Sequence, residues 1–566
     1  MDSDLPSVVG CSDVGSSDVG SSDVGWDDVA DVVVIGFGAA GVCAALEAVD
    51  AAADVLVLDR FAGGGATAIS GGIVYAGGGT DEQRAAGVTD TPEDMYAYLS
   101  LETKGAVRDE TLRRFVDESV SMIEWLKGHG VPFEGSLAPY KTSYPTNEHY
   151  LYYSGNELSG PARAVAKPAA RGHRARGKGT SGKAFFAPLR AALERKGARI
   201  RPQTRADDLV LDDHGRVVGV ICSTMAGAPA HARAQHAWLS KRVGKLNLWY
   251  RPVGKRLSAR LVEIERRHLR RWTVEARRGV VVSAGGFAFN REMVRQLAAP
   301  YARGLPLGTL GDDGAGIRMG RGAGGATRRM SRMSAWRFYC PPSALAKGLL
   351  LGANGQRVCD ESLYGAAVAE AVIHEYGGSA YLLVDRPLLD EARAQIPKQT
   401  LWFQRLQARS MLGTRIEAAT LAGALGKAGI DVAVGERKVA AYNELASAGT
   451  EDPLGKQSEL LQPLATPPYS IIDVSVRASM RFPCPTMSLG GLVVDEDTGQ
   501  VLDEADAPIP GLYAAGRSAV GICSESYVSG LSLADCVFSG RRAGRAVGAA
   551  GVAPDVSTVP GGSDAD

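Results

Sequence analysis

The first strongly apolar segment of the chain covers residues 32–35, where four β-branched side chains follow one another. A short continuous run of this kind predicts a strand that is buried on both faces, as in a parallel sheet. An Ala-rich stretch with helical spacing continues to about residue 48, and residues 54–58 form a second apolar run. Strand, helix and strand in about thirty residues are typical of a βαβ unit.

The same pattern returns twice later in the chain. Residues 279–287 and 511–516 each predict a buried strand that ends in a glycine turn, and a helix follows the second to about residue 547. Residues 185–196 predict an amphipathic helix, and 209–220 a hairpin. Strands that alternate with helices in this way predict an α/β fold.

Other segments have no clear apolar period. They are a glycine-rich loop at 61–80, helical segments around 107–128, a polar and aromatic excursion at 134–160 and a basic loop at 171–176. Residues 231–280 carry 14 Lys or Arg against three Glu, which predicts an inserted, solvated surface element. The first 30 residues repeat Ser-Asp-Val-Gly at a period too short for a folded repeat, which predicts disorder.

Composition narrows the class of protein. The chain has 566 residues, and its 63 basic and 63 acidic side chains cancel, which argues against a nucleic-acid-binding protein. Its eight cysteines form no CxxC pair and no Cys/His cluster, so no metal site is predicted. The acidic, polar N-terminus and the absence of a long apolar stretch lead us to expect a cytoplasmic protein with free thiols.

The turn after the first strand carries the clearest chemistry. Gly36, Gly38 and Gly41 stand between strand and helix, and Asp59 ends the second strand. Glycines at this spacing let the backbone turn tightly and approach a pyrophosphate at the helix N-terminus, while the acid would accept ribose hydroxyls. The sequence therefore predicts a dinucleotide site.

Three later segments favour FAD over NAD as the dinucleotide. They are the loop with Ser70, Gly71 and Gly72, the strand turn at 283–287, and residues 513–517 before the last helix. In this order of segments the chain resembles the flavoprotein family of fumarate reductase and the 3-ketosteroid dehydrogenases over about residues 31–547. The resemblance implies a Rossmann-like FAD-binding domain with an inserted α+β substrate domain.

The implied boundaries are 26–306 with 485–550 for the FAD-binding domain and 307–484 for the substrate domain, with disordered tails at 1–25 and 551–566. The residues implied to contact FAD are Gly36, Gly38, Ala39, Ala40, Gly41, Asp59, Arg60, Thr67, Ser70, Gly71, Gly72, Ala206, Ala284, Gly285, Gly286, Gly516, Arg517, Gly530, Ser532 and Leu533.

Within this family, members that act on dicarboxylates need buried cations, because an uncompensated buried charge is costly. The family's proton-donating arginine corresponds here to Gly365, and residues 523–535 contain no cation where those reductases have an arginine. Met487 stands where a histidine often precedes two glycines. The resemblance therefore implies a neutral, fairly apolar substrate.

Tyr364 and the Tyr-x-Ser-Gly sequence at 527–530 are similar to the 3-ketosteroid Δ4-(5α)-dehydrogenases. This implies desaturation of a 5α-3-ketosteroid, with proton loss from C4 and hydride transfer from C5 to flavin N5. Tyr527 and the backbone N–H of Gly530 would donate to the C3 oxygen, and Ser529 with Tyr364 would relay the C4 proton. Which hydroxyl touches C4 stays open.

Three alternatives stay open beside this interpretation. They are a 3-ketosteroid Δ1-dehydrogenase, an enoate or enone reductase working in the fumarate reductase direction, and a catalytically idle flavin-binding protein. A Δ1 enzyme needs a further tyrosine in the N-terminal half, and other tyrosines rival the catalytic pair; the candidates are Tyr96, Tyr98, Tyr140, Tyr339, Tyr376 and Tyr381. Beyond the steroid, we expect an electron acceptor that the sequence does not identify, and weak membrane-surface contact through 231–280.

Overall fold

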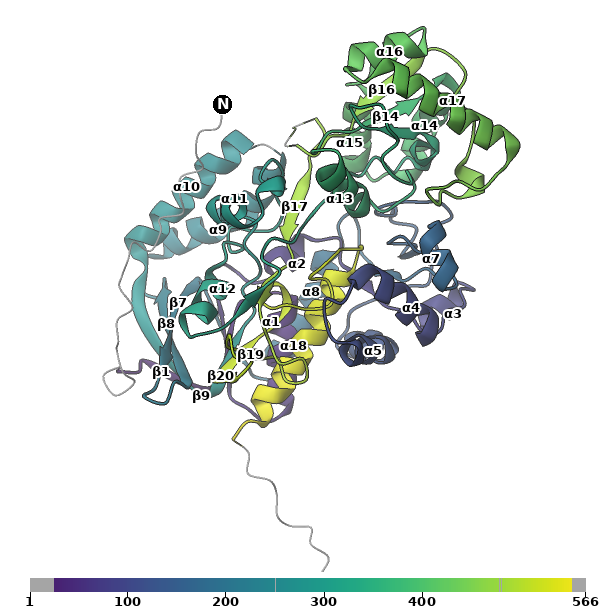
Figure 1. Cartoon of the computed structure of the whole chain (residues 1–566). Helices are drawn as coiled ribbons and strands as arrows, with labels where there is room; N and C mark the ends of the chain where they lie inside the picture. The colour runs from purple at the N-terminus through teal and green to yellow at the C-terminus, as the bar shows by residue number, and fades with distance from the viewer. Residues whose placement is uncertain (1–24, 250, 478, 480, 552–566) are drawn as a thin grey trace, which may run out of the picture.

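The computed structural model describes residues 25–551, except residues 250, 478 and 480. The two predicted disordered tails therefore fall almost wholly outside the described residues. Figure 1 shows a larger body built on one extended sheet and a second body, rich in helices, beside it. None of the helices in the described part of the chain is long and apolar enough to cross a membrane.

The largest sheet has eight strands in the order β19-β20-β9-β1-β2-β6, and β8 and β7 extend it from β9. The inner pairings among β20, β9, β1, β2 and β6 are parallel, whereas β7, β8 and β19 pair antiparallel. The strands are β1 (Asp28–Ile35), β2 (Val55–Asp59), β6 (Arg199–Pro202), β7 (Thr204–Leu211), β8 (Val217–Thr224), β9 (Arg270–Val282), β19 (Gln500–Leu502) and β20 (Pro508–Ala514).

The predicted βαβ unit and the α/β fold are confirmed. All four side chains at 32–35 are buried, and they alternate between two apolar clusters on opposite faces of the sheet. The predicted hairpin is β7 and β8. The helices that bury the first of these faces are α1 (Ala39–Asp50), α4 (Pro92–Thr103), α5 (Asp109–Asp117), α6 (Ser119–Gly128), α8 (Gly182–Arg195) and α18 (Leu531–Ala549).

Helices α1 and α18 lie side by side, although they come from opposite ends of the chain (Figure 1). A Cβ atom at Gly540 would lie 2.4 Å from the carbonyl oxygen of Ala40, and one at Gly544 would lie 2.3 Å from that of Ala44. Only glycine allows the two backbones to approach this closely. This contact fixes the C-terminal segment against the glycine turn after β1.

A second sheet, entirely antiparallel, lies within residues 349–473 in the order β13-β14-β16-β15. Its strands are β13 (Leu349–Leu351), β14 (Tyr381–Val384), β15 (Ile416–Ala418) and β16 (Tyr469–Asp473). The helices around it are α13 (Gly365–Glu375), α14 (Arg386–Gln399), α15 (Trp402–Leu412), α16 (Leu421–Ala428) and α17 (Val432–Ala448).

Three small sheets lie outside the two larger ones. They are β10 (Leu305–Pro306), β12 (Met333–Ala335) and β17 (Pro485–Ser488) in one sheet, β11 (Thr327–Arg328) with β18 (Gly491–Leu492) in another, and β3 (Ile73–Tyr75), β4 (Leu151–Tyr152) and β5 (Gly172–Arg174) in a third. The short helices between are α2 (Gly65–Ile69), α3 (Asp81–Ala85), α7 (Gly160–Val165), α11 (Arg291–Leu297) and α12 (Ala315–Gly322). The predicted boundaries at 306/307 and 484/485 stay a proposal. β10 and β17 lie in the proposed FAD-binding domain and β12 lies in the proposed substrate domain, so this sheet joins the two.

Two predicted loops were wrong. The glycine-rich segment 61–80 contains helix α2 and strand β3. The basic segment 171–176 contains strand β5, and the side chains of Arg171 and Arg174 are fully buried. Arg171 pairs with the buried carboxylate of Asp90 at 2.7 Å, and Arg174 donates to backbone carbonyls. Asp90 lies 81 residues and Pro145 29 residues before its arginine partner, so the sequence pattern did not reveal these two contacts.

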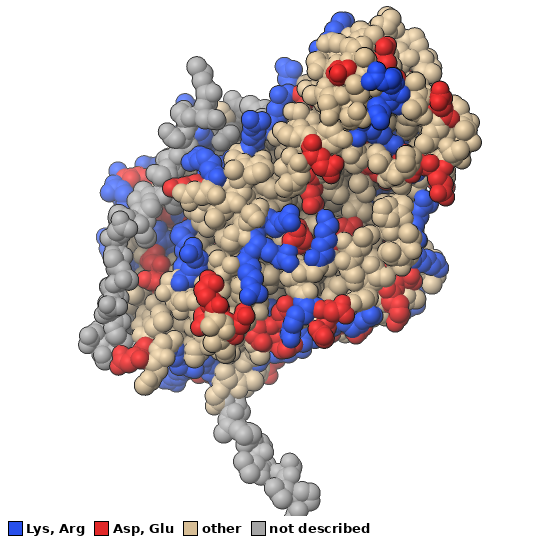
Figure 2. Space-filling model, in the orientation of Figure 1, with Lys and Arg blue, Asp and Glu red and all other residues tan. Residues whose placement is uncertain are grey.

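The prediction for 231–280 was partly wrong. Its first part forms the helical hairpin α9 (Ala230–Trp249) and α10 (Arg251–His268), but residues 270–280 belong to β9 in the main sheet. The hairpin has a small core of its own, which includes Leu239 and Leu261 and contacts Phe61 of the main body. The face in Figure 2 carries interspersed positive and negative side chains, in keeping with the zero net charge.

Candidate active site

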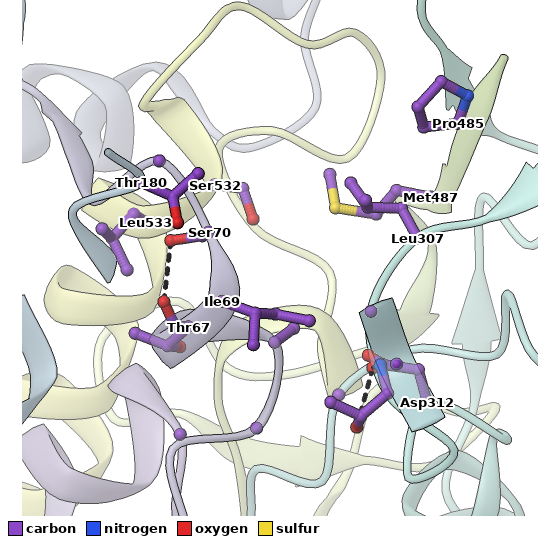
Figure 3. Close-up of a pocket in the computed structure, with 18 of the residues that line it drawn as sticks. Thr67, Ile69, Ser70, Thr180, Leu307, Asp312, Pro485, Met487, Ser532 and Leu533 are labelled. Carbon is purple, nitrogen blue, oxygen red and sulfur yellow. Dashed lines mark hydrogen bonds between the residues drawn. The ribbon is translucent and has the colours of Figure 1, made fainter. Parts of the chain in front are cut away.

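A cavity of about 1160 Å³ lies where the carboxyl ends of the parallel strands meet the second body. Open α/β sheets bind ligands at this edge. Every predicted site residue lines the cavity except Gly41 and Gly286. Figure 3 shows part of the wall, with Thr67, Ser70 and Leu533 on one side and Leu307 and Met487 facing them.

The two exceptions are packing positions behind the wall. A Cβ at Gly41 would lie 1.9 Å from the carbonyl oxygen of Gly36, and one at Gly286 would lie 2.1 Å from the hydroxyl of Ser488. Both glycines therefore bring segments together rather than contact the contents of the cavity. For Gly41 this is the helix-packing role that the third glycine of the fingerprint has.

Two helix N-termini face the cavity. Gly38 is the N-cap of α1 and Gly530 the N-cap of α18, and neither N-cap residue has a side chain to bond the helix start. At α1 the hydroxyl of Thr67, which also lines the cavity, accepts the backbone N–H of Ala39 at 3.0 Å. Free backbone N–H groups and the helix dipole make such ends good sites for anionic or electron-rich ligand groups. Gly36, with φ of +96°, allows the close approach of β1 to Ser283 that shapes the first of these sites.

Two charged residues of the wall, Asp59 and Arg60, are already paired. The Asp59 carboxylate accepts backbone N–H groups of Phe37, Phe61 and Gly63 at 2.8–3.1 Å, so it organises the loop around the glycine turn. The guanidinium of Arg60 binds Glu265 at 2.8 Å and Asp313 at 3.0 Å. Burial acts to raise the pKa of Glu265, but Arg60 and His236 outweigh it and hold the pKa at about 2.

Arg517 leaves one group for a ligand. Its Nη2 forms an ion pair with Asp312, whereas its Nη1 is buried and has no hydrogen-bond partner among the described residues. An unsatisfied buried donor of a charged side chain is costly, so an acceptor is expected there. The wall, the two helix ends and this guanidinium fit FAD, which has phosphate oxygens and ring carbonyls to offer.

The other end of the cavity is aromatic. The rings of Tyr364 and Tyr527 lie 6.2 Å apart between centroids, Trp336 lies 5.3 Å from Tyr527, and Phe338 lies 5.4 Å from Tyr364. Further apolar wall residues from the second body and its connections are Pro341, Trp402, Phe403, Met411, Phe482, Pro485 and Met487. A rigid, apolar ligand of several fused rings would replace water favourably here.

Burial determines the state of the two phenols. It raises the pKa of Tyr527, while the backbone N–H of Gly530 reaches the phenol and lowers the pKa. The pKa of Tyr364 is likewise raised by burial and by the neighbouring phenols, and is lowered by a hydrogen bond with Ser529. Both phenols are therefore neutral donors at neutral pH. Tyr527 and Gly530, proposed from sequence as a donor pair, both line this cavity.

The cations of this wall do not form a carboxylate clamp. Besides Arg60 and Arg517, the described wall residues include Arg205, Lys178 and Arg481, of which Lys178 and Arg481 are exposed and Arg205 pairs with Asp207 at 2.6 Å. At Gly365, the position that corresponds to the family arginine, a Cβ would lie 2.6 Å from the carbonyl oxygen of Arg337. No side chain fits at this position without a backbone shift.

The alternative tyrosines lie elsewhere. None of Tyr96, Tyr98, Tyr140, Tyr339, Tyr376 and Tyr381 is among the described residues that line the cavity. The sequence analysis missed Trp336, Phe338, Asn156 and Asp312. The Asn156 carboxamide oxygen accepts the backbone N–H of Tyr364 at 2.7 Å. For Trp336 and Phe338, the concentration of aromatic residues at 336–339 was a signal in the sequence that could have been used.

Comparison with known proteins agrees with this geometry. Residues 31–530 match the family described as FAD binding domain. The 3-oxo-5-alpha-steroid 4-dehydrogenase of Comamonas testosteroni is 39% identical over 499 residues, which cover 86% of this chain and 92% of that protein. The crystal structure of the 3-ketosteroid-delta4-(5alpha)-dehydrogenase of Rhodococcus jostii RHA1 in complex with 4-androstene-3,17-dione is 31% identical, with a TM-score of 0.78, and covers 94% of this chain and 99% of that one.

More distant structures share the fold. The 3-ketosteroid delta1-dehydrogenase of Sterolibacterium denitrificans is 19% identical with a TM-score of 0.65, over 92% of this chain and 100% of that one. At this identity the likeness shows a common architecture alone.

Proposed function

Because the chain belongs to the FAD-binding-domain family of flavoproteins, we propose that it uses FAD to oxidise a 5α-3-ketosteroid to its 4-ene. The observation that carries this proposal is the aromatic end of the cavity, where hydroxyl donors replace a carboxylate clamp. The 39% identity to a 3-oxo-5-alpha-steroid 4-dehydrogenase supports the same substrate class.

The chain's own residues would supply binding, orientation and polarisation. Tyr527 and the N–H of Gly530 would donate to the C3 oxygen, which makes the C4 hydrogen more acidic as enolate charge develops. Tyr364 and Ser529 would receive the C4 proton. When bound, FAD supplies the hydride acceptor for the hydrogen that leaves C5. The aromatic wall would exclude water and hold the ring system flat against this acceptor.

The state of the tyrosines favours one regiochemistry. A Δ1-dehydrogenase needs a further tyrosine from the N-terminal half, and Tyr96, Tyr98 and Tyr140 are not among the described lining residues. Tyr144 from that half does line the cavity, but its phenol hydrogen is directed to the backbone carbonyls of Gly71 and Gly179, at 2.9 and 3.1 Å. An enoate reductase needs cations for the carboxylate, and position 365 has no room for one. We therefore favour C4–C5 desaturation.

The visible spectrum of the purified holoenzyme tests the proposal. When oxygen is excluded, addition of a 5α-3-ketosteroid should reduce the flavin and so bleach its visible absorbance. Bleaching by a 4-ene-3-ketosteroid alone would show a Δ1 enzyme instead. Fumarate-dependent reoxidation of the reduced protein would indicate a reductase, and an unchanged spectrum with every steroid would indicate an idle binding protein.

We also propose weak contact of the hairpin α9–α10 with an anionic lipid surface, where lipophilic substrates collect. The hairpin is basic, Trp238 is 50% exposed, and Gly244 of α9 lines the cavity. Basic and aromatic side chains on a helix favour an interfacial position on anionic bilayers. Co-sedimentation with phosphatidylserine vesicles should fall with salt and vanish with phosphatidylcholine alone; equal binding to both would refute the contact.

A further inference from the structure

One asparagine side chain holds the backbone of Tyr364 in place. Asn156 lies between β4 and α7, and 7% of its surface is exposed. Its carboxamide oxygen accepts the backbone N–H of Tyr364 at 2.7 Å, and its carboxamide nitrogen donates to the carboxylate of Glu102 at 2.8 Å. Neither Asn156 nor Glu102 is among the described residues of the cavity wall. Asn156 therefore connects α4, which contains Glu102, with the start of α13.

The two partners allow only an amide, and only one orientation of it. Turned the other way, the carboxamide would place its NH2 group against the N–H of Tyr364 and its oxygen against the carboxylate of Glu102. Both contacts would then be repulsive. An aspartate at this position would have no hydrogen for Glu102 unless it were protonated. An aliphatic side chain would leave the buried N–H of Tyr364 without its partner, which is costly.

Asn156 is bound to α4 at two points. The Tyr98 hydroxyl accepts the backbone N–H of Asn156 at 2.8 Å and donates to the Glu102 carboxylate at 2.9 Å. Tyr98 is 1% exposed, and its ring belongs to the apolar core that α4 shares with the neighbouring helices. The three residues form a closed ring of hydrogen bonds, so Asn156 has little freedom to move relative to α4.

The same turn of α4 also holds the segment of the second phenol. The backbone carbonyl of Glu102 accepts the hydroxyl of Ser526, the residue before Tyr527, and Ser526 is 8% exposed. Glu102 is thus connected by its side chain, through Asn156, to the backbone of Tyr364. By its backbone it is connected to the neighbour of Tyr527. The rings of the two tyrosines lie 6.2 Å apart between centroids.

We propose that Asn156 and Glu102 are positioning residues, which set the spacing between the phenols of Tyr364 and Tyr527. This rests on the proposed steroid oxidation. The two residues act on the backbone of the phenol segments and not on the phenol oxygens, so their role is the same whichever phenol exchanges a proton. Reacting groups need exact placement, since a displacement of about 1 Å can cost roughly 100-fold in rate.

The first test compares Asn156→Leu with the wild-type holoenzyme in anaerobic single turnovers with a 5α-3-ketosteroid. The rate of flavin bleaching at saturating steroid should fall by roughly 10-fold to 100-fold, because the phenols are no longer held in register. The steroid concentration that gives half the maximal rate should stay within about twofold of the wild type, since the apolar wall is unchanged. Flavin content should also stay at the wild-type level.

Asn443→Leu is the matched control. The carboxamide oxygen of Asn443 also accepts a backbone N–H, that of Leu464, at 2.7 Å, and neither residue is among the described residues of the cavity wall. Both substitutions remove the same kind of hydrogen bond, so both should lower the melting temperature. Only Asn156→Leu should lower the bleaching rate.

Asn156→Asp provides a pH-dependent readout that a loss of packing would not produce. Its carboxyl group would face that of Glu102, whose pKa is raised, chiefly by burial. The other titratable and charged groups that act on Glu102 are Tyr98, Glu157, Lys104 and Lys141. Two carboxyl groups in contact share one proton, which can replace the amide hydrogen, and they repel each other when both are ionised. The ratio of the variant's bleaching rate to the wild-type rate should therefore fall by roughly tenfold between about pH 6 and about pH 9.

Several outcomes would overturn the proposal. They are a wild-type bleaching rate in Asn156→Leu, an equal loss of rate in Asn443→Leu, and a rate ratio for Asn156→Asp that does not change with pH. If Asn156→Leu does not fold, Ser526→Ala removes the connection to the other phenol segment. It should lower the bleaching rate several-fold at unchanged half-saturation, and a wild-type rate would again overturn the proposal. Wild-type protein that oxidises no steroid would instead refute the proposed function.

Discussion

At the scale of single residues, the site depends on hydrogen-bond donors that burial keeps neutral. Tyr527 is the clearest case, because burial raises the pKa of its phenol and it lines the same cavity as Gly530, the proposed second donor. A pair of this kind stabilises oxyanion charge in a water-excluded site far better than it would in water. Because the phenol is neutral, it keeps its hydrogen and can donate it to a developing oxyanion.

Tyr527→Phe should therefore lower kcat by roughly 100-fold to 1000-fold, the usual cost of one oxyanion donor. Flavin content, read from the visible spectrum, should stay at the wild-type level, because the ring still packs against Trp336. Loss of flavin in proportion to activity would show that the residue is structural.

Sequence reasoning at this scale succeeded where a residue type and a local motif coincide. Tyr364, Tyr527 and Ser529, which line the cavity, each stand in a segment with a recognisable order of residues. Asn156 was missed because its partner, the backbone N–H of Tyr364, lies 208 residues away. Nothing in a polar, aromatic stretch indicates which of its side chains will face a segment so distant along the chain.

At the scale of elements, the contact between α1 and α18 holds the cofactor site together. The glycines at 540 and 544 face backbone carbonyls, which cannot move aside as a flexible side chain can. The N-terminus of α18 lines the cavity through Gly530, Ser532 and Leu533. A shift of α18 should therefore move these wall residues and weaken flavin binding.

Gly544→Ala should destabilise the fold by about 1–3 kcal/mol, because the added methyl overpacks the helix contact. The variant should also lose flavin more readily on dilution, as measured by the fluorescence of released FAD. Gly322→Ala is the control, since a Cβ there meets nothing within 4 Å and the substitution favours helix. Equal melting temperatures for the two variants would contradict the expectation.

The hairpin α9–α10 is fixed to the main sheet by the ion pair of Glu265 with Arg60. Because the folded pKa of Glu265 is about 2, below its ordinary value of 4.5, the pair stabilises the fold above pH 4.5. This contribution is lost as the pH falls from 4.5 towards 2. Glu265→Gln should lower the free energy of unfolding by on the order of 3 kcal/mol at neutral pH. Between pH 4.5 and pH 2 the free energy of unfolding of the variant should depend less steeply on pH than that of the wild type.

Glu263→Gln is the matched control for that measurement. Glu263 lies on the same helix, at the surface, and its partners among the described residues are Arg266 and Arg267 of its own helix. Exposed pairs of this kind contribute little, so its curve should follow that of the wild type. The sequence predicted an inserted, solvated element at 231–280 but not this buried pair, because Arg and Glu are common surface residues.

At the scale of the whole molecule, the cavity opens beside an exposed apolar face of α15. Trp402 is 76% exposed and Leu406 64% exposed, and both line the cavity. Large apolar side chains at an opening favour the capture of an apolar ligand. The buried strands of the main sheet were predictable from apolar runs, but their order in the sheet and the place of α15 relative to it were not.

Trp402→Ala together with Leu406→Ala should raise the KM for steroid several-fold and leave kcat and the melting temperature unchanged, because both side chains are largely exposed. Steady-state kinetics at fixed acceptor concentration measure this. Leu101→Ala, which removes a 40% exposed side chain away from the described cavity wall, is the control. A fall in kcat instead would indicate that α15 orders the catalytic end.

The wall of the cavity begins at Ile35 and is completed only within α18, at Cys536. Residues 35–536 must therefore all be synthesised before the dinucleotide has a complete place to bind. We expect truncated chains that lack α18 to remain colourless, so that the yellow colour of a preparation separates molecules that contain α18 from those that do not.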